Sequence, residues 1–233
     1  MTLGRRLAAE GVGTAFLLAA VVGSGIMGER LASGNVALAL LANSAATGAA
    51  LFALILTFGP ISGAHFNPAV TLVDAWLGGL SWRDAPRYIL VQIAGAFAGV
   101  VVAHAMFGEP LLVASAKVRA GWAQILSEFV ATFGLVAVIW GCSRQRTSAV
   151  AVAVAAYIMA AYWFTASTSF ANPAVTLARA ATDTFAGIRP ADAVPFIAAQ
   201  LLGAFAASVL FRWLLPSLPA RKLLVPHNEA REP

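Results

Sequence analysis

Asn-Pro-Ala-Val-Thr-Leu stands at residues 67–72 of this chain and again, unchanged, at residues 172–177. Two more pairs of blocks flank these hexapeptides in the same order: Glu-x-Val-x-Thr at 10–14 and 128–132, and Gln-x-x-Gly-Ala-Phe-Ala at 92–98 and 200–206. Blocks that recur in one order indicate an internal repeat. We therefore predict two homologous halves, residues 1–120 and 121–215, followed by a tail at 216–233.

The composition is that of a membrane protein. Of 233 residues, 60% are apolar and 11% are charged, and the mean hydropathy is +0.82, whereas soluble domains carry about 25% charged residues. A helix needs roughly 20 apolar residues to cross a bilayer. Six runs approach that length: 7–28, 36–58, 86–107, 121–142, 148–166 and 194–215. The predicted fold class is all-α membrane, with six transmembrane helices and no space for a soluble catalytic domain.

Two shorter apolar runs, residues 67–77 and 172–182, each begin at an Asn-Pro-Ala box. Each extends about 16 Å as a helix, too little to cross a hydrocarbon core of about 30 Å, so we predict two re-entrant half-helices. Each half of the chain then holds three spans, and an odd number of spans gives the halves opposite orientations. This inverted repeat brings the half-helices together from opposite faces, with their Asn-Pro-Ala starts near mid-bilayer.

The charges predict the orientation in the membrane. With the N-terminus inside, ten of the 15 lysines and arginines are cytoplasmic, as the positive-inside rule requires. This asymmetry explains the net charge of +5, so we expect no nucleic-acid partner. Both termini, including the tail at 216–233, are predicted to be cytoplasmic. The single cysteine, Cys142, excludes an intrachain disulfide and a thiolate metal cluster.

The chemistry of the two boxes suits a water-filled lumen. A helix that begins inside the membrane has unpaired N–H groups at its first turn, and lipid offers them no acceptor. Asn67 and Asn172 occupy favoured N-cap positions, and Pro68 and Pro173 occupy the first turn, where no N–H is needed. The two amides then donate to a permeating oxygen, while the two helix dipoles repel cations and protons.

Ser-Gly-Ala-His-Phe-Asn-Pro-Ala-Val-Thr at residues 62–71, with the second box at 172–174, resembles the aquaporin and aquaglyceroporin family over residues 5–215. The resemblance implies that the boxes line the pore: Asn67, Pro68, Ala69, Asn172, Pro173 and Ala174. It also implies an hourglass channel that passively conducts small neutral solutes, assembled as a homotetramer with one pore per subunit. No His, Cys and carboxylate cluster has metal-ligand spacing, so we expect no metal and no cofactor. We expect it in the bacterial inner (plasma) membrane, surrounded by lipid.

The residue after the second box departs from the family pattern. The family usually has a pore-lining arginine there, and this chain has Val175. Spacing from the two boxes places the other filter residues at Thr47, Ala160 and Ser169. A filter of these four residues is wide and uncharged, so selection by size is relaxed. The resemblance is closest to the aquaglyceroporins of bacterial arsenic-resistance operons, which also lack the arginine and pass arsenicals.

Four ionisable residues near the boxes need an interpretation. Glu10 and Glu128 occupy equivalent repeat positions, and we interpret them as acceptors that brace the loops before the half-helices, with a proton relay as the alternative. His65 either lines the pore or braces its own loop. Arg179, one turn beyond Val175, either makes the vestibule positive or snorkels to the membrane surface.

Three classes of function compete. A coupled secondary transporter also uses inverted repeats and broken helices, but it needs unpaired acidic residues at the midplane, where this chain has amides. An intramembrane enzyme needs a nucleophile with its base, or a metal-ligand cluster, and the spans carry neither. We therefore predict a channel and not an enzyme, with permeants drawn from water, glycerol, urea, metalloid hydroxides such as arsenite, and organoarsenicals.

Overall fold

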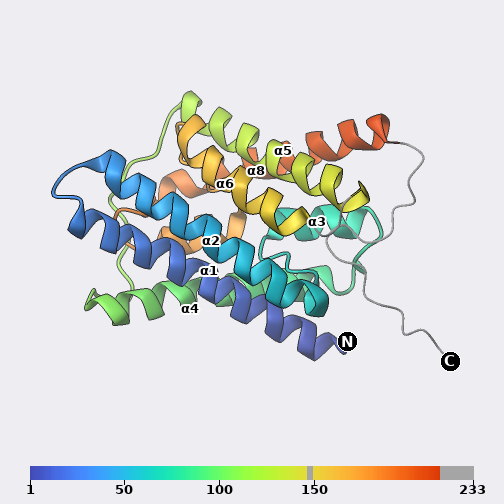
Figure 1. Cartoon of the computed structure of the whole chain (residues 1–233), viewed down its shortest axis with the longest axis horizontal. Coiled ribbons are helices and arrows are strands. Elements are labelled where there is room, and N and C mark those ends of the chain that lie inside the picture. The colour runs from blue at the N-terminus through green and yellow to red at the C-terminus, as the bar shows by residue number, and fades with distance from the viewer. Residues whose placement is uncertain (146–148, 216–233) are drawn as a thin grey trace.

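The computed structural model describes residues 1–145 and 149–215 as eight helices, of which the long ones lie roughly parallel or antiparallel to one another (Figure 1). Their bounds are α1 Leu3–Leu31, α2 Val36–Ser62, α3 Pro68–Trp76, α4 Ala85–Phe107, α5 Trp122–Gln145, α6 Val150–Phe164, α7 Pro173–Arg179 and α8 Pro190–Leu214. The described ranges contain no strand. The predicted tail at 216–233 lies outside them.

Each of the six predicted spans is found as a helix. Five of these, α1, α2, α4, α5 and α8, are long and apolar enough to cross a membrane, and α6 is a shorter apolar helix of 15 residues. Some helices extend beyond the apolar runs, and α2 continues to Ser62 rather than residue 58. Hydropathy marks the part of a helix that lies in lipid, whereas the helix itself continues to its cap. For α2 the cap is Gly63, with a φ of 95°.

The two halves of the chain pack in the same way. In the first half α1 packs against α2 and α4, and in the second half α5 packs against α6 and α8. The halves meet where α2 contacts α6 and where α3 contacts α7. Each half-helix also packs on the last long helix of the opposite half, α3 on α8 and α7 on α4. These matching contacts agree with the inverted repeat predicted from the sequence.

Two glycines at equivalent repeat positions allow close helix crossings. A Cβ on Gly95 of α4 would lie 2.2 Å from the carbonyl oxygen of Gly11, and a Cβ on Gly203 of α8 would lie 2.4 Å from that of Phe129. Both obstructing atoms belong to the backbone of the facing helix and cannot move aside as a side chain can. Small residues therefore set the distance between the first and last long helices of each half.

Gly95→Val or Gly203→Val is expected to prevent this close crossing. Overpacking costs about 1–3 kcal/mol where side chains can shift, and more against backbone. We expect the yield of folded protein to fall several-fold, measured by size-exclusion chromatography in detergent. Gly4→Val is the control, because a Cβ added at Gly4 would meet no neighbouring atom within 4 Å. Wild-type yields for both core variants would contradict this prediction.

Candidate functional site

Both half-helices begin at the Asn-Pro-Ala boxes. Asn67 caps α3, because its side-chain oxygen Oδ1 accepts a hydrogen bond of 2.9 Å from the N–H of Ala69. Asn172 caps α7 and accepts from the N–H groups of Ala174 at 3.0 Å and Val175 at 3.3 Å. A proline follows each cap in the first helical turn. Since the amide oxygens serve the helices, the amide nitrogens are available for other partners.

The second half-helix is shorter than predicted. It ends at Arg179, whereas the apolar run continues to residue 182. The carbonyl oxygens of Ala180 and Ala181 accept hydrogen bonds, each of 3.0 Å, from the backbone N–H groups of Ser115 and Val113. The carbonyl oxygen of Arg179 accepts from the N–H of Ile188 at 3.2 Å, and not from the N–H four residues further on. The α-helical hydrogen-bond pattern therefore stops here, and the loop between α4 and α5 pairs with the residues that follow.

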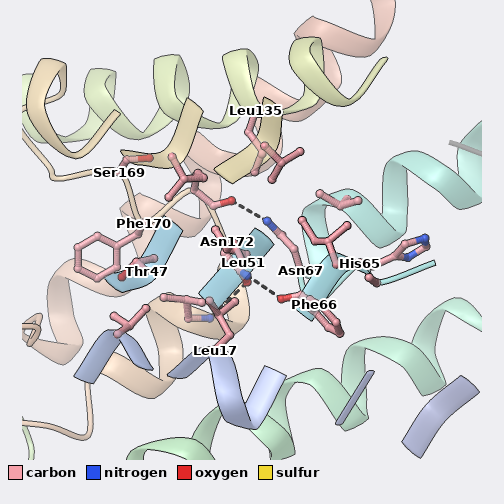
Figure 2. Close-up of a pocket in the computed structure, with 18 of the residues that line it drawn as sticks. Leu17, Thr47, Leu51, His65, Phe66, Asn67, Leu135, Ser169, Phe170 and Asn172 are labelled. Atoms are coloured by element: carbon pink, nitrogen blue, oxygen red, sulfur yellow. Dashed lines mark hydrogen bonds between the residues drawn. The ribbon is translucent and has the colours of Figure 1, made fainter. Parts of the chain in front are cut away.

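A reciprocal pair of hydrogen bonds joins the two boxes (Figure 2). The amide nitrogen Nδ2 of Asn67 donates to the carbonyl oxygen of Ala171 at 2.8 Å, and Nδ2 of Asn172 donates to that of Phe66 at 2.7 Å. Each acceptor directly precedes the opposite box. An asparagine amide carries two N–H groups, so one ties the loops together and the other serves the cavity beside it.

Two buried glutamates hold the loops in front of the boxes. The carboxylate of Glu10 accepts hydrogen bonds from the backbone N–H groups of His65 at 3.0 Å and Phe66 at 2.7 Å. Glu128 accepts two bonds of 2.9 Å from the equivalent pair, residues 170–171. Side chains that donate to the same two carboxylates are Ser62, Gln92 and Gln200. Both glutamates are 0% exposed.

The braced loops contain strained backbone. Positive φ angles between 48° and 50° occur at Ala64 and Phe66 before the first box and at Ser169 and Ala171 before the second. Left-handed conformations of such residues cost about 1–3 kcal/mol each. The hydrogen bonds to the buried carboxylates offset this cost. The contacts therefore have the geometry that a bracing role requires, and that role remains to be tested against the proton relay.

Glu10→Gln and Glu128→Gln test the bracing role. Glutamine offers one acceptor oxygen in place of two and turns an NH₂ group toward N–H donors of the loop. We expect a lower yield of folded protein, with flux per folded molecule within about twofold of wild type. Glu109→Gln is the control, since Glu109 forms a partly exposed ion pair with Arg30. A folded variant that no longer conducts would favour the relay.

A narrow cavity of about 60 Å³ passes both boxes (Figure 2). Asn67 and Asn172 line it, together with side chains of the two loops and of the surrounding helices. This volume has room for a few water-sized molecules. Three of the four predicted filter residues line the cavity, namely Thr47, Ser169 and Val175.

The structure moves the fourth filter position to another residue. Ala160 is exposed, and the residues of α6 that line the cavity are Val154, Ile158 and Tyr162. These three recur every four residues and share one helix face, whereas position 160 lies about 200° around the helix from position 158. The prediction of Ala160 is therefore wrong. The hydroxyl of Tyr162 lies 3.3 Å from that of Thr47, so a polar aromatic side chain stands at this wall.

The position of His65 is compatible with both of its alternative interpretations. Its backbone N–H belongs to the braced loop, and its ring lines the cavity. Nδ1 lies 3.1 Å from the hydroxyl of Thr71, and Nε2 lies 3.4 Å from the carboxylate of Asp74. These two polar contacts hold the ring at the cavity wall.

Arg179 is buried at the cavity and does not extend into solvent. It is 2% exposed, and its Cζ lies 3.4 Å from the centroid of the Phe170 ring. Its Nε donates to the carbonyl oxygen of Ala186. This geometry disagrees with the snorkelling alternative. The sequence analysis did not single out Phe170. The repeat could have identified it, since Phe170 precedes the second box by two residues, as His65 precedes the first.

Comparison with known proteins agrees with this architecture. A family model described as major intrinsic protein matches residues 1–149 and residues 143–230. The chain belongs to this family. This major intrinsic protein is 57% identical over 222 residues to aquaglyceroporin AqpS of Rhizobium meliloti (strain 1021), which is 95% of this chain and 94% of that protein. It is 41% identical over 135 residues to aquaporin NIP1-4 of Oryza sativa subsp. japonica, which is 57% of this chain and 48% of that protein.

A solved structure has the same fold. The X-ray structure of the aquaglyceroporin from Plasmodium falciparum matches this major intrinsic protein with a TM-score of 0.73 at 17% sequence identity. The match covers 92% of this chain and 98% of the other. The predicted fold class is confirmed. Family membership also confirms a multi-pass membrane channel for solutes rather than an enzyme, and it does not favour a coupled transporter.

Proposed function

We propose that this major intrinsic protein passively conducts small uncharged solutes: glycerol, water, urea and metalloid hydroxides such as arsenous acid, with organoarsenicals among the larger ones. The observation that carries the proposal is Val175, which lines the cavity directly after the second box. A valine at that position leaves room that a long arginine side chain would occupy. Hydroxyl-bearing side chains that line the same cavity are Thr47, Tyr162 and Ser169.

The chemistry of the permeants supports this range. Glycerol and arsenous acid each present three hydroxyl groups on a small neutral frame, so a lumen that admits one suits the other. Hydroxyl groups and amides along the wall exchange hydrogen bonds with such solutes without requiring a charge. The relative at 57% identity carries the name aquaglyceroporin, which agrees with solutes of this size.

The proposal includes a location and an assembly. We place the protein in the bacterial inner membrane with both termini cytoplasmic, because that orientation puts most lysines and arginines inside. We also propose a homotetramer. Large apolar side chains on the outward faces of the long helices, such as Phe16, Leu90 and Leu202, are exposed in the single chain and support burial in lipid or against a neighbouring subunit.

Stopped-flow light scattering on proteoliposomes tests the proposed range of solutes. We expect uptake of water, glycerol, urea and arsenous acid above the rate of protein-free liposomes, driven by the solute gradient alone. An imposed proton or sodium gradient is expected to leave these rates unchanged, and a dependence on it would favour the coupled transporter. Water flux without uptake of any other solute would refute the proposed range.

A further inference from the structure

An arginine, Arg179, lies one helical turn beyond Val175, the position where the family usually has an arginine. Arg179 follows Val175 by four residues on α7, and both residues line the same cavity. Four residues are about one turn, so the two side chains share a face of the helix. Arg179 contacts the ring of Phe170, and Figure 2 shows Phe170 and His65 at opposite ends of the site. The guanidinium therefore stands at the end of the lumen remote from His65.

Contacts with the backbone and with a second arginine fix this end of the lumen. The Phe170 ring contacts both Arg179 and Arg119, and the Cζ of Arg119 lies 5.0 Å from the ring centroid. Arg119 donates to the carbonyl oxygens of Ser167 at 3.0 Å and Gly187 at 2.8 Å. Guanidinium groups on an aromatic face are favoured electrostatically. The aromatic ring and its two cations thus form a positioned cluster.

Polar groups of the cluster remain available to a ligand. The bond from Nε of Arg179 to Ala186 uses one of the five N–H donors of a guanidinium. Ser169 is one of the residues that line the cavity, and its hydroxyl is buried without a hydrogen-bond partner among the described residues. A buried polar group without a partner costs stability. An oxygen-bearing solute in the lumen satisfies both residues.

We propose that Arg179 is the filter cation of this channel, displaced by one turn from the usual position, and that it forms with the Ser169 hydroxyl a binding site for the oxygen atoms of the permeating solute. The inference rests on the proposed function and adds the residue that decides charge selectivity. Val175 then sets the width of the lumen, and Arg179 supplies a barrier to cations and protons beyond that of the half-helix dipoles.

Two further cations, Lys117 and Arg119, lie near Arg179, and the carboxylates of Glu29 and Asp183 partly balance them. Lys117 and Arg119 belong to the loop between α4 and α5. The pKa of Lys117 is lowered to about 8, first by burial and then by the positive charges of Arg119 and Arg179. Arg119 and Arg179 contact the same Phe170 ring, and the shift of Lys117 agrees with a position near both. Their combined field favours a solute oxygen and opposes a permeating cation.

Three variants at the site and one control test the inference in proteoliposomes. Arg179→Met removes the charge, and Arg179→Lys keeps the charge without the planar donors. The double variant Val175→Arg/Arg179→Met returns an arginine to the usual position. Arg30→Met is the control, because Arg30 pairs with Glu109 and lies outside the set of cavity-lining residues. Each protein is scored for proton leak, with a trapped pH-sensitive dye, and for glycerol and water permeability.

We expect Arg179→Met to raise the proton leak about tenfold in a channel that still conducts water, and the double variant to restore exclusion. Arg179→Lys is expected to exclude protons but to lose glycerol uptake several-fold, because an ammonium group does not present a planar pair of donors. Arg30→Met is expected to match wild type in all three measurements.

Two outcomes would overturn the inference. Folded Arg179→Met protein with a wild-type proton leak shows that Arg179 is not the barrier. If Arg179→Met does not fold, the Arg179→Lys variant decides. Glycerol uptake by Arg179→Lys at the wild-type rate would refute the proposed binding of solute oxygen atoms by Arg179. Glycerol permeability of the wild-type protein is measured first, as a separate test of the proposed function. The comparison of proton leak between variants does not depend on that result, since it applies equally to a channel that conducts only water.

Discussion

Replacing Asn67 or Asn172 by aspartate is expected to abolish most of the solute flux. Each amide nitrogen donates to a carbonyl oxygen of the opposite loop, at 2.8 Å for Asn67 and 2.7 Å for Asn172. Aspartate has no donor there and sets a charged oxygen against the carbonyl. A buried charge without a partner costs about 3–5 kcal/mol. The variant therefore loses both the bond that joins the boxes and the donor that faces the cavity.

Stopped-flow uptake of glycerol, normalised to the amount of folded protein, measures this effect. We expect a decrease of about tenfold or more in each variant. Asn35→Asp is the matched control, because Asn35 caps α2 by accepting from the N–H of Leu38 and its side chain is exposed. Aspartate serves equally well at such a cap. Normal flux together with a normal yield of Asn67→Asp or Asn172→Asp would refute the role of the boxes.

Val175→Arg is expected to narrow the channel and to change its selectivity. Val175 is buried and lines a cavity of only about 60 Å³, so a long charged side chain reduces the space for solutes. Its five donors also bind small permeants strongly. We expect glycerol and larger solutes, including organoarsenicals, to lose permeability several-fold more than water does. The new charge lies one turn from Arg179 and adds to the field there.

Permeability measured solute by solute in matched proteoliposomes, together with proton leak, tests this prediction. Val36→Arg is the control for an added charge, because Val36 is an exposed residue at the start of α2 and does not line the cavity. Val175→Met is the control for added bulk without charge. If Val175→Arg lowers the permeability of all solutes by one common factor, Val175 does not set the width of the lumen and our placement of the constriction is wrong.

The sequence by itself determined the features that short-range physics governs. The repeated blocks predicted two similarly packed halves, and the apolar runs predicted six helices because a span must match the thickness of the bilayer. Asn67 and Asn172 predicted the starts of the half-helices, since a cap and the proline after it act within one turn. Glu10 and Glu128 were paired with the correct loops because the repeat places them at equivalent positions.

Only the tertiary structure decided which side chains meet in the lumen. The rotation of α6 places Tyr162 at the wall and Ala160 on the exposed face, because packing against α2 and α5 selects the inward face of that helix. A backbone hydrogen bond from Ile188 occupies the carbonyl oxygen of Arg179 where α7 ends, and the loop between α4 and α5 pairs with the two residues after Arg179. The fold also packs the guanidinium group of Arg179 against the ring of Phe170. Contacts between residues far apart in sequence depend on how whole helices pack, and neither periodicity nor capping reports that packing.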